Sequence, residues 1–165
     1  MNIIIEQPSY AHIPEIARIC ATGWKQTVEG QLSEAFQDKN IDYWYNHNKV
    51  REDIDSGSYS YVALIGSKLV GTIGGMMTTQ ERGDIFVLYV DENYRYQGIG
   101  HQLLDEFTKE QVSAGVKEQW VSVQKDNWRG IPFYESNGFV LQEENSRKTD
   151  TGEIHISLKY KRKVA

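Results

Sequence analysis

The residues best suited to chemistry in this sequence lie at positions 95–100 (RYQGIG), directly after an apolar run at 83–90. Glycine has no Cβ atom, so a ligand can approach the backbone closely at Gly98 and Gly100. A helical pattern of apolar residues begins at Ile99, and the first N–H groups of a helix have no partners within it and lie at the positive end of its dipole. A strand, a glycine loop and a helix start in this order predict an anion site suited to a pyrophosphate.

Two other phosphate-binding loops fit these residues less well. A dinucleotide-binding loop needs a third glycine at the position of Leu103. A P-loop needs Gly-Lys-Ser/Thr, whereas His101 and Gln102 follow Gly100. The absent third glycine therefore argues against a nucleotide-binding domain.

A second block follows at positions 127–139 (NWRGIPFYESNGF), after a strand-like segment at 118–124. Asn127 is a favourable N-cap residue, and Gly138 stands where a left-handed glycine would end a helix. Phe133 and Phe139 are expected to anchor that short helix to the sheet. Each half of the pattern is common, but the two blocks in this order and at this spacing together form a specific pattern.

The elements that position these blocks follow from the apolar periodicity. We expect strands at 3–6, 59–65, 69–77, 83–90, 119–123, 140–147 and 153–160, with a hairpin turn at 66–68. A first helix starts near Pro14, a second helical region lies between 33 and 54, and further helices occupy 98–114, which Gly115 ends, and the segment after Asn127. This order mixes hairpins with one central βαβ unit.

Residues 95–100 resemble the Arg/Gln-x-x-Gly-x-Gly/Ala acyl-CoA loop of the GNAT N-acetyltransferase superfamily. Residues 127–139 resemble that superfamily's Asn-x-x-Ala-x-x-Phe-Tyr-x-x-x-Gly-Phe segment. The resemblance implies an α/β (mixed α+β) acetyltransferase fold with a central twisted mixed sheet of about six to seven strands, splayed at the CoA site and flanked by about four helices. It also implies a single N-acetyltransferase domain over residues 1–165, with acetyl-CoA as the co-substrate and no metal.

The same resemblance assigns functional residues by their matching positions. The strand before the loop contacts pantetheine through its main chain at Leu88 and Val90, and the loop contacts the phosphates. The cofactor-binding positions are therefore Leu88, Val90, Arg95, Tyr96, Gln97, Gly98, Ile99, Gly100, His101, Asn127 and Tyr134. At Tyr96 many relatives carry glycine, so we expect altered access on the 3′-phosphate side.

Tyr134 and Asp84 are the predicted catalytic residues. Tyr134 matches the superfamily tyrosine that protonates the leaving thiolate; the alternative is an aromatic residue that only packs between helix and sheet. The protonated acceptor amine needs a base, often a carboxylate acting through water, and Asp84 lies where many relatives carry an acid. Strand alternation leaves open which face Asp84 occupies, because a bulge near Val87 would re-aim it.

The acceptor is expected to bind between the first helices and the last hairpin, near residues 23–27, 43–45 and those after Leu141. An acidic protein with aromatic residues at 43–45 favours a small cationic amine such as a polyamine. A protein or peptide N-terminal amine remains an alternative. A non-catalytic acyl-CoA-binding sensor is another, but such a module needs neither Tyr134 nor Asp84.

Composition limits the other classes. The net charge of −5 argues against general nucleic-acid binding, and no apolar run approaches the roughly 20 residues needed to span a membrane. The N-terminus lacks the features of a signal peptide, and the single Cys20, expected in the core, suits a reducing cytoplasm. The four histidines show no metal-binding spacing. The expected partners are acetyl-CoA and an amine, with a homodimer left open.

Overall fold

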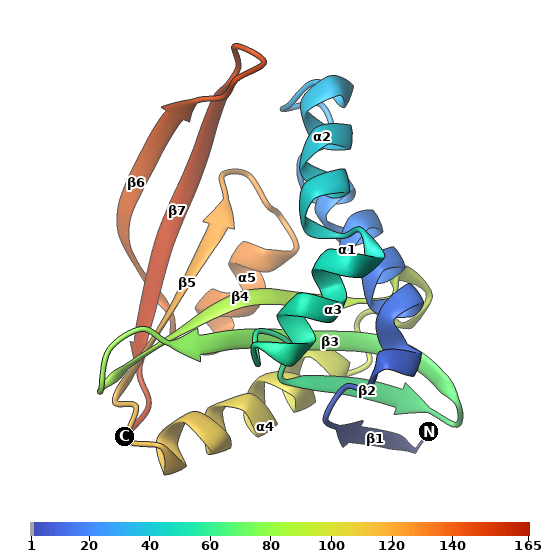
Figure 1. Ribbon diagram of the computed structural model, residues 1–165. Helices are drawn as coiled ribbons and strands as arrows, with labels where there is room; N and C mark the ends of the chain where they lie inside the picture. Colours follow the sequence, from blue (N-terminus) through green and yellow to red (C-terminus); the bar gives the residue numbers. More distant parts are fainter. Residues whose placement is uncertain (1) are drawn as a thin grey trace.

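Seven strands form one mixed sheet in the computed structural model, which describes residues 2–165 (Figure 1). The strands are β1 (Ile3–Glu6), β2 (Tyr61–Ile65), β3 (Lys68–Met77), β4 (Arg82–Val90), β5 (Glu118–Gln124), β6 (Val140–Lys148) and β7 (Ile154–Lys163). Their order is β1-β2-β3-β4-β5-β7-β6, and within residues 2–165 only β4 and β5 run parallel. This arrangement confirms the mixed α/β sheet predicted from the sequence.

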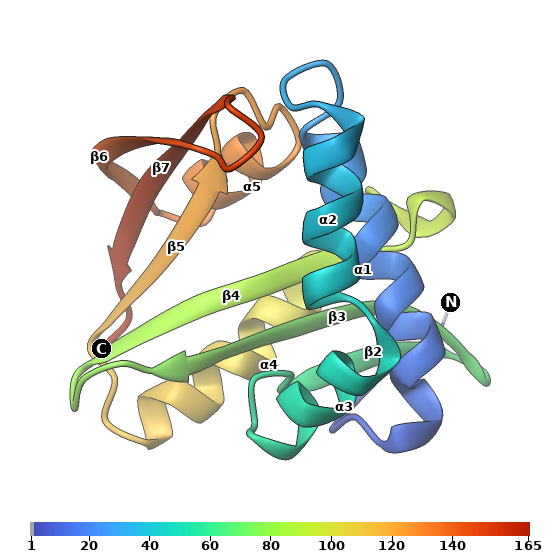
Figure 2. The ribbon, with the colours of Figure 1, turned by 45° about the horizontal axis from the view of Figure 1, so that its top comes forward.

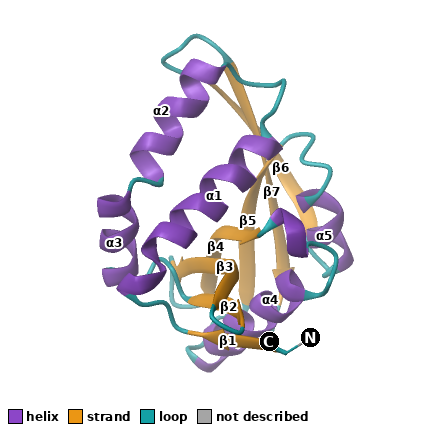
Figure 3. Cartoon of the chain, turned by 90° about the vertical axis from the view of Figure 1, so that its right-hand side faces the viewer, coloured by secondary structure: helices purple, strands orange, loops and turns teal. Residues whose placement is uncertain are grey.

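Within residues 2–165, five α-helices and two short 3-10 helices accompany the sheet. They are α1 (Ile13–Thr27), α2 (Glu34–Trp44), α3 (His47–Asp55), α4 (Ile99–Ser113) and α5 (Gly130–Ser136), with η1 (Tyr10–His12) and η2 (Glu92–Tyr94). Helices α1 to α3 lie on one face of the sheet and α4 lies on the other (Figures 2 and 3). The crossover from β4 to β5 runs through α4, as the central βαβ unit requires.

The count of helices exceeds the predicted four by one, because the region between residues 33 and 54 forms two helices. Helix α2 ends at Trp44, and the Asn46 side chain then accepts a hydrogen bond from the Lys49 amide at 2.8 Å. Asparagine is among the best N-cap residues, so it starts a new helix in a new direction. Apolar spacing alone does not reveal that break.

Strand β4 contributes to the hydrophobic core on both faces of the sheet. Ile85 is buried against α4 with Leu103 and Phe107, whereas Val87 and Tyr89 pack against the buried residues of α1. Cys20 of α1 is fully buried in this second core, which confirms its predicted packing role. The central strand is therefore held firmly by helices on both sides.

A β-bulge at Phe86 separates these two sets of residues. Ile85 lies opposite Gly75 and Val87 lies opposite Gly74, so Phe86 has no partner on β3. One extra residue reverses the alternation of side chains, which is why Ile85 and Val87 lie on opposite faces. Neither partner can carry a side chain, because a Cβ atom would lie 1.9 Å from the Ser58 carbonyl oxygen at Gly74 and 1.9 Å from the Asp84 carbonyl oxygen at Gly75.

Strands β4 and β5 diverge immediately after the bulge begins. Their ladder pairs Arg82 with Glu118 through Ile85 with Val121 and then stops. The predicted splay of the sheet is present, and it starts at Ile85, earlier than the expected position near Val87. From residue 86 to residue 90, β4 therefore has no strand partner on its β5 side.

Candidate active site

A cleft of about 1440 Å³ occupies the space between the diverging strands. Its walls come from β4 at residues 85–90, the loop and helix start at 94–101, β5 at 121–124 and the α5 segment at 127–137. Further walls come from α1, α2, α3 and the β6–β7 hairpin. Since side chains from both faces of β4 line the cleft, it passes through the sheet from the α4 side to the α1 side.

The glycine loop forms one end of this cleft. Gly98 is the N-cap of α4 and has a left-handed backbone with φ of 85°. Residues other than glycine rarely adopt this conformation. Apart from Gly98 itself, its two chain neighbours and the adjoining backbone of α4, no atom of residues 2–165 lies within 4 Å of the place where its Cβ would be. The open space and the free N–H groups at the start of α4 suit an anionic group.

Tyr96 adopts the same unusual backbone region, with φ of 62°. The side chain is 83% exposed and lines the cleft. A left-handed backbone conformation favours glycine. This explains why the superfamily pattern often has glycine at this position. The chain therefore tolerates backbone strain here and places an exposed aromatic ring at the mouth of the cleft.

Two guanidinium groups lie at this end of the cleft. Arg95 donates a hydrogen bond to Gln26 Oε1 at 2.6 Å, and Arg129 lies 4.5 Å from the centre of the Trp128 ring. Burial and then the positive charge of Arg129 lower the pKa of Arg95. Two cations that repel each other favour binding of an anion between them.

Arg129 and Trp128 line the cleft, but the sequence did not single them out. They occupy variable positions of the 127–139 pattern, between Asn127 and Gly130, so a motif carries no information about them. Only their position directly after β5 would have indicated that they lie close to the loop. The cleft of this chain is thus more basic at its loop end than the motif alone predicts.

Asn127 shapes the turn that leads into α5. Its Oδ1 accepts a hydrogen bond from the Gly130 amide at 2.9 Å, and its carbonyl accepts one from the Ile131 amide at 3.0 Å. Gly138, with φ of 87°, ends the helix as expected. The N-cap position of α5 is Arg129 rather than the predicted Asn127, which instead holds the turn before the helix and lines the cleft.

Tyr134 presents a packed ring with an open hydroxyl. The side chain is 6% exposed, and its ring centre lies 5.3 Å from those of Phe133 and Phe139. Within residues 2–165 no group hydrogen-bonds to the hydroxyl, and no buried side-chain nitrogen or oxygen is without a partner, so the hydroxyl opens to the cleft that Tyr134 lines. Burial raises the pKa of Tyr134, which keeps the hydroxyl protonated and able to donate a proton.

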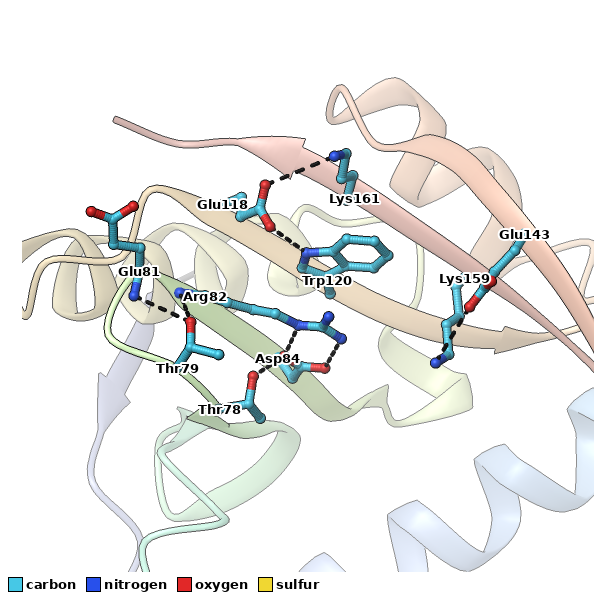
Figure 4. Close-up of polar contacts among 10 residues, drawn as sticks. All are labelled: Thr78, Thr79, Glu81, Arg82, Asp84, Glu118, Trp120, Glu143, Lys159 and Lys161. Carbon is cyan, nitrogen blue, oxygen red and sulfur yellow. Dashed lines mark hydrogen bonds and ion pairs between the residues drawn. The ribbon is translucent and has the colours of Figure 1, made fainter.

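Asp84 lies in a network of polar side chains at the start of β4 (Figure 4). Its Oδ1 accepts hydrogen bonds from Arg82 Nε at 2.8 Å and Thr78 Oγ1 at 2.7 Å, and its Oδ2 accepts one from Arg82 Nη2 at 3.0 Å. The Arg82 guanidinium in turn lies 4.2 Å from the centre of the Trp120 ring. Partial burial acts to raise the pKa of Asp84, but the hydrogen bonds from Arg82 and Thr78 outweigh it and the pKa is lowered.

This position does not support the prediction that Asp84 is the base. The bulge does place Asp84 on the α1 face with Val87, but Asp84 is not among the residues that line the cleft. Both carboxylate oxygens already accept hydrogen bonds from Arg82 or Thr78, and a lowered pKa makes the group a weaker proton acceptor. Gln97 also differs from expectation, since it is exposed and does not line the cleft. The other predicted site residues all line it.

Aromatic side chains surround the opposite end of the cleft, on the α1 side. Trp24, Trp44, Tyr45, Tyr59 and Tyr89 line this chamber. Tyr43, expected to belong to the same wall, is 60% exposed and lies outside the cleft, where its ring contacts Trp44 at 4.8 Å. Two of the three residues at 43–45 therefore form the predicted aromatic wall.

The β6–β7 hairpin closes the chamber by contacting the start of α2, and both lie together at the top of Figures 1 and 2. Glu153 Oε1 accepts a hydrogen bond from the Ser33 amide at 3.1 Å, and Lys39 forms an ion pair with Asp150. The Phe36 ring centre lies 6.2 Å from that of His155. These contacts link the two segments expected to select the acceptor.

Neither a metal-binding cluster nor a membrane-spanning helix is present in residues 2–165. Within that range, no group of three or more His, Cys, Asp or Glu side chains is placed to hold a metal ion. No helix in the same range has the length and apolar character needed to cross a membrane.

Known N-acetyltransferases resemble this chain in sequence and in fold. The profile of the Acetyltransferase (GNAT) family matches residues 21–139. The Spermidine N(1)-acetyltransferase of Thermoplasma acidophilum is 26% identical over 164 residues, which cover 97% of this chain and 99% of that protein. The ribosomal protein bS18-alanine N-acetyltransferase of Escherichia coli K12 is 36% identical over 59 residues, or 36% of this chain and 40% of that protein.

A solved structure shows the same fold over almost the whole chain. The PaiA N-acetyltransferase of Thermoplasma acidophilum, determined in complex with coenzyme A, superposes with a TM-score of 0.80 at 25% identity. The match covers 97% of this chain and 100% of that one. With the family profile, the shared fold and the cleft between β4 and β5 in agreement, the chain belongs to the Acetyltransferase (GNAT) family.

Proposed function

We propose that the amine which this N-acetyltransferase acetylates from acetyl-CoA is a small polyamine, bound in the aromatic chamber. The observation that carries the proposal is the single cleft that joins a basic glycine loop to a chamber of Trp and Tyr rings. Aromatic faces attract ammonium groups. The relative that matches nearly the whole chain is a spermidine acetyltransferase, which supports the same acceptor class.

Acetyl-CoA would lie along the loop end and the unpaired side of β4. The N–H groups around Gly98 and Gly100, with Arg95, Arg129 and His101, would hold its phosphates. The pantetheine amides would pair with the main chain of β4 at Leu88 and Val90, where β5 has moved away. This placement directs the thioester toward the hydroxyl of Tyr134.

The transfer proceeds by direct attack in a ternary complex. The unprotonated amine nitrogen attacks the thioester carbonyl carbon, the new C–N bond forms and the C–S bond breaks. Tyr134 gives its phenolic proton to the departing thiolate and recovers a proton from the solvent. The proton lost by the acceptor nitrogen passes to water in the cleft, because Arg82 and Thr78 occupy both oxygens of Asp84.

A screen of amines for CoA release tests the proposal. Purified protein and acetyl-CoA would be incubated with spermidine, spermine, putrescine, a monoamine and a peptide with an N-terminal alanine. We expect the highest kcat/KM with a polyamine. A preference for the peptide would instead favour the acceptor class of the bS18-alanine relative. Tight acetyl-CoA binding with no CoA release from any amine would favour a non-catalytic acyl-CoA-binding role.

A further inference from the structure

We infer that Asp53 of α3 binds the second ammonium group of the acceptor and that Lys49 occupies this position when no acceptor is bound. The inference rests on the proposed polyamine acceptor and identifies the residue that would distinguish a polyamine from a monoamine. Neither residue belongs to the motifs that indicated the site. Their importance comes from where α3 places them.

Asp53 is the one carboxylate among the described residues that line the cleft. The other charged lining residues are the cations Lys49, Arg95, Arg129 and Arg147. Arg95 and Arg129 lie at the loop end, where an anion is expected. An acceptor with two or more ammonium groups therefore finds a negative partner in the cleft wall only at Asp53.

The surroundings of Asp53 connect it to the point where β4 leaves β5. Its carbonyl accepts a hydrogen bond from the Ser58 amide at 2.8 Å. The Ser58 carbonyl is packed so closely on Gly74 that a Cβ there would lie 1.9 Å away, and Gly74 pairs with Val87 beside the bulge. A short loop thus fixes Asp53 near the part of the cleft where the thioester is expected.

Lys49 shows that a primary ammonium group fits this position. Its Nζ lies 3.2 Å from Asp53 Oδ1 and 5.2 Å from the centre of the Trp44 ring, which also lines the cleft. The side chains of Lys49 and Asp53 are 26% and 17% exposed, so water screens the pair only partly. A carboxylate beside an aromatic face is the combination that recognises an alkylammonium ion.

An incoming acceptor can replace Lys49 without leaving Lys49 unsupported. The Lys49 ammonium also lies 6.0 Å from the Tyr43 ring, on the outer side of the chamber. It can remain near Tyr43 and solvent while the acceptor ammonium pairs with Asp53. Lys49 and the acceptor therefore compete for the same carboxylate, and the two residues affect acceptor binding in opposite directions.

Steady-state kinetics with spermidine and with butylamine, at saturating acetyl-CoA, test this competition. We expect Asp53→Asn to raise KM for spermidine by about tenfold while KM for butylamine stays nearly unchanged. Lys49→Met should lower KM for spermidine several-fold, because it removes the competing ammonium. Glu52→Gln is the control, since it removes the same charge from the exposed neighbouring position of α3.

A purely structural ion pair would give a different result. Both Asp53→Asn and Lys49→Met break the same pair, so a structural role would change KM in the same direction in both variants, and equally for both amines. That result, obtained with a wild-type protein that prefers spermidine, would overturn the inference and leave the proposed function intact. A wild-type protein that turns over butylamine or a peptide but not spermidine would overturn both.

Discussion

At Tyr134, a single substitution can distinguish a catalytic role of the hydroxyl from a packing role of the ring. Its ring contacts Phe133 and Phe139, while its hydroxyl has no hydrogen-bond partner among residues 2–165. We expect Tyr134→Phe to lower kcat by about 10²-fold with near-native KM for acetyl-CoA. The melting temperature should stay close to that of the parent, because no protein hydrogen bond is lost. A fully active Phe variant would return Tyr134 to a packing role.

The raised pKa of Tyr134 also determines the pH profile. Burial disfavours the charged phenolate, so the hydroxyl remains protonated above the pH at which a free tyrosine, with a pKa of 10.0, ionises. We expect kcat/KM to rise with pH as the acceptor amine loses its proton, without a fall near pH 10. A descending limb below pH 10 that disappears in Tyr134→Phe would contradict this assignment.

Asp84 gives a second prediction at the scale of one residue. Because both of its oxygens accept hydrogen bonds from Arg82 and Thr78, we expect Asp84→Asn to change kcat/KM by a constant factor at every pH. A base would behave differently, with the largest loss at low pH, where few acceptor amines are free. The measurement is the ratio of variant to parent kcat/KM from pH 6 to pH 9. Glu81→Gln, which makes the same change from carboxylate to amide on the exposed neighbouring turn, is a suitable control.

Among single residues, the sequence predicted those that lie within local motifs. Gly98, Asn127 and Tyr134 line the cleft as expected because loop, helix start and short helix are set by neighbours in the chain. Asp53 could not be predicted in the same way, since its place in the cleft depends on how α3 packs on the sheet. The contact between Asp84 and Arg82 could not be predicted either, because strand alternation says nothing about side-chain partners.

The glycine loop and the start of α4 form the element that we propose to hold the phosphates. We expect Gly98→Ala to weaken acetyl-CoA binding by at least tenfold, since its methyl group would enter space that the ligand needs. The left-handed backbone adds a stability cost of about 1–2 kcal/mol. Titration calorimetry measures the binding and thermal unfolding measures the stability.

Gly66→Ala separates these two effects. Gly66, in the turn between β2 and β3, has φ of 61°, and its Cβ position likewise has no atom of residues 2–165 within 4 Å other than those of Gly66 and its chain neighbours. Its substitution should cause a similar loss of stability with unchanged affinity for acetyl-CoA. Equal affinity in both variants would show that the loop does not contact the ligand closely.

At the level of elements, apolar periodicity was sufficient to predict most strands and α4. It was insufficient to predict features that depend on how two segments pack against each other. The bulge at Phe86 depends on Gly74 and Gly75 in β3 and on the loop at Ser58 that packs against them. No single segment contains that information. The extra helix had a local cause in Asn46, which could have been noticed as a cap.

At the scale of the whole molecule, the fold follows from the order of the elements, but the shape of the cleft does not. One parallel pair in an otherwise antiparallel sheet was expected from the single βαβ unit. The closure of the chamber by Ser33 and Glu153 joins residues 120 positions apart in the sequence, and no periodicity predicts it. The closure of the aromatic chamber is therefore a feature that only the folded structure defines.

The cleft that crosses the sheet has a consequence for the timing of the reaction. One substrate can enter from the α4 side and the other from the α1 side, so the two substrates can bind in either order. We expect initial-rate plots with varied acetyl-CoA and varied amine to intersect, and either product to dissociate first. Each product should inhibit competitively against the substrate that shares its entrance. Parallel lines would indicate instead that acetyl-CoA gives up its acyl group before the amine binds. A single shared entrance would impose an ordered mechanism, in which one substrate always binds first.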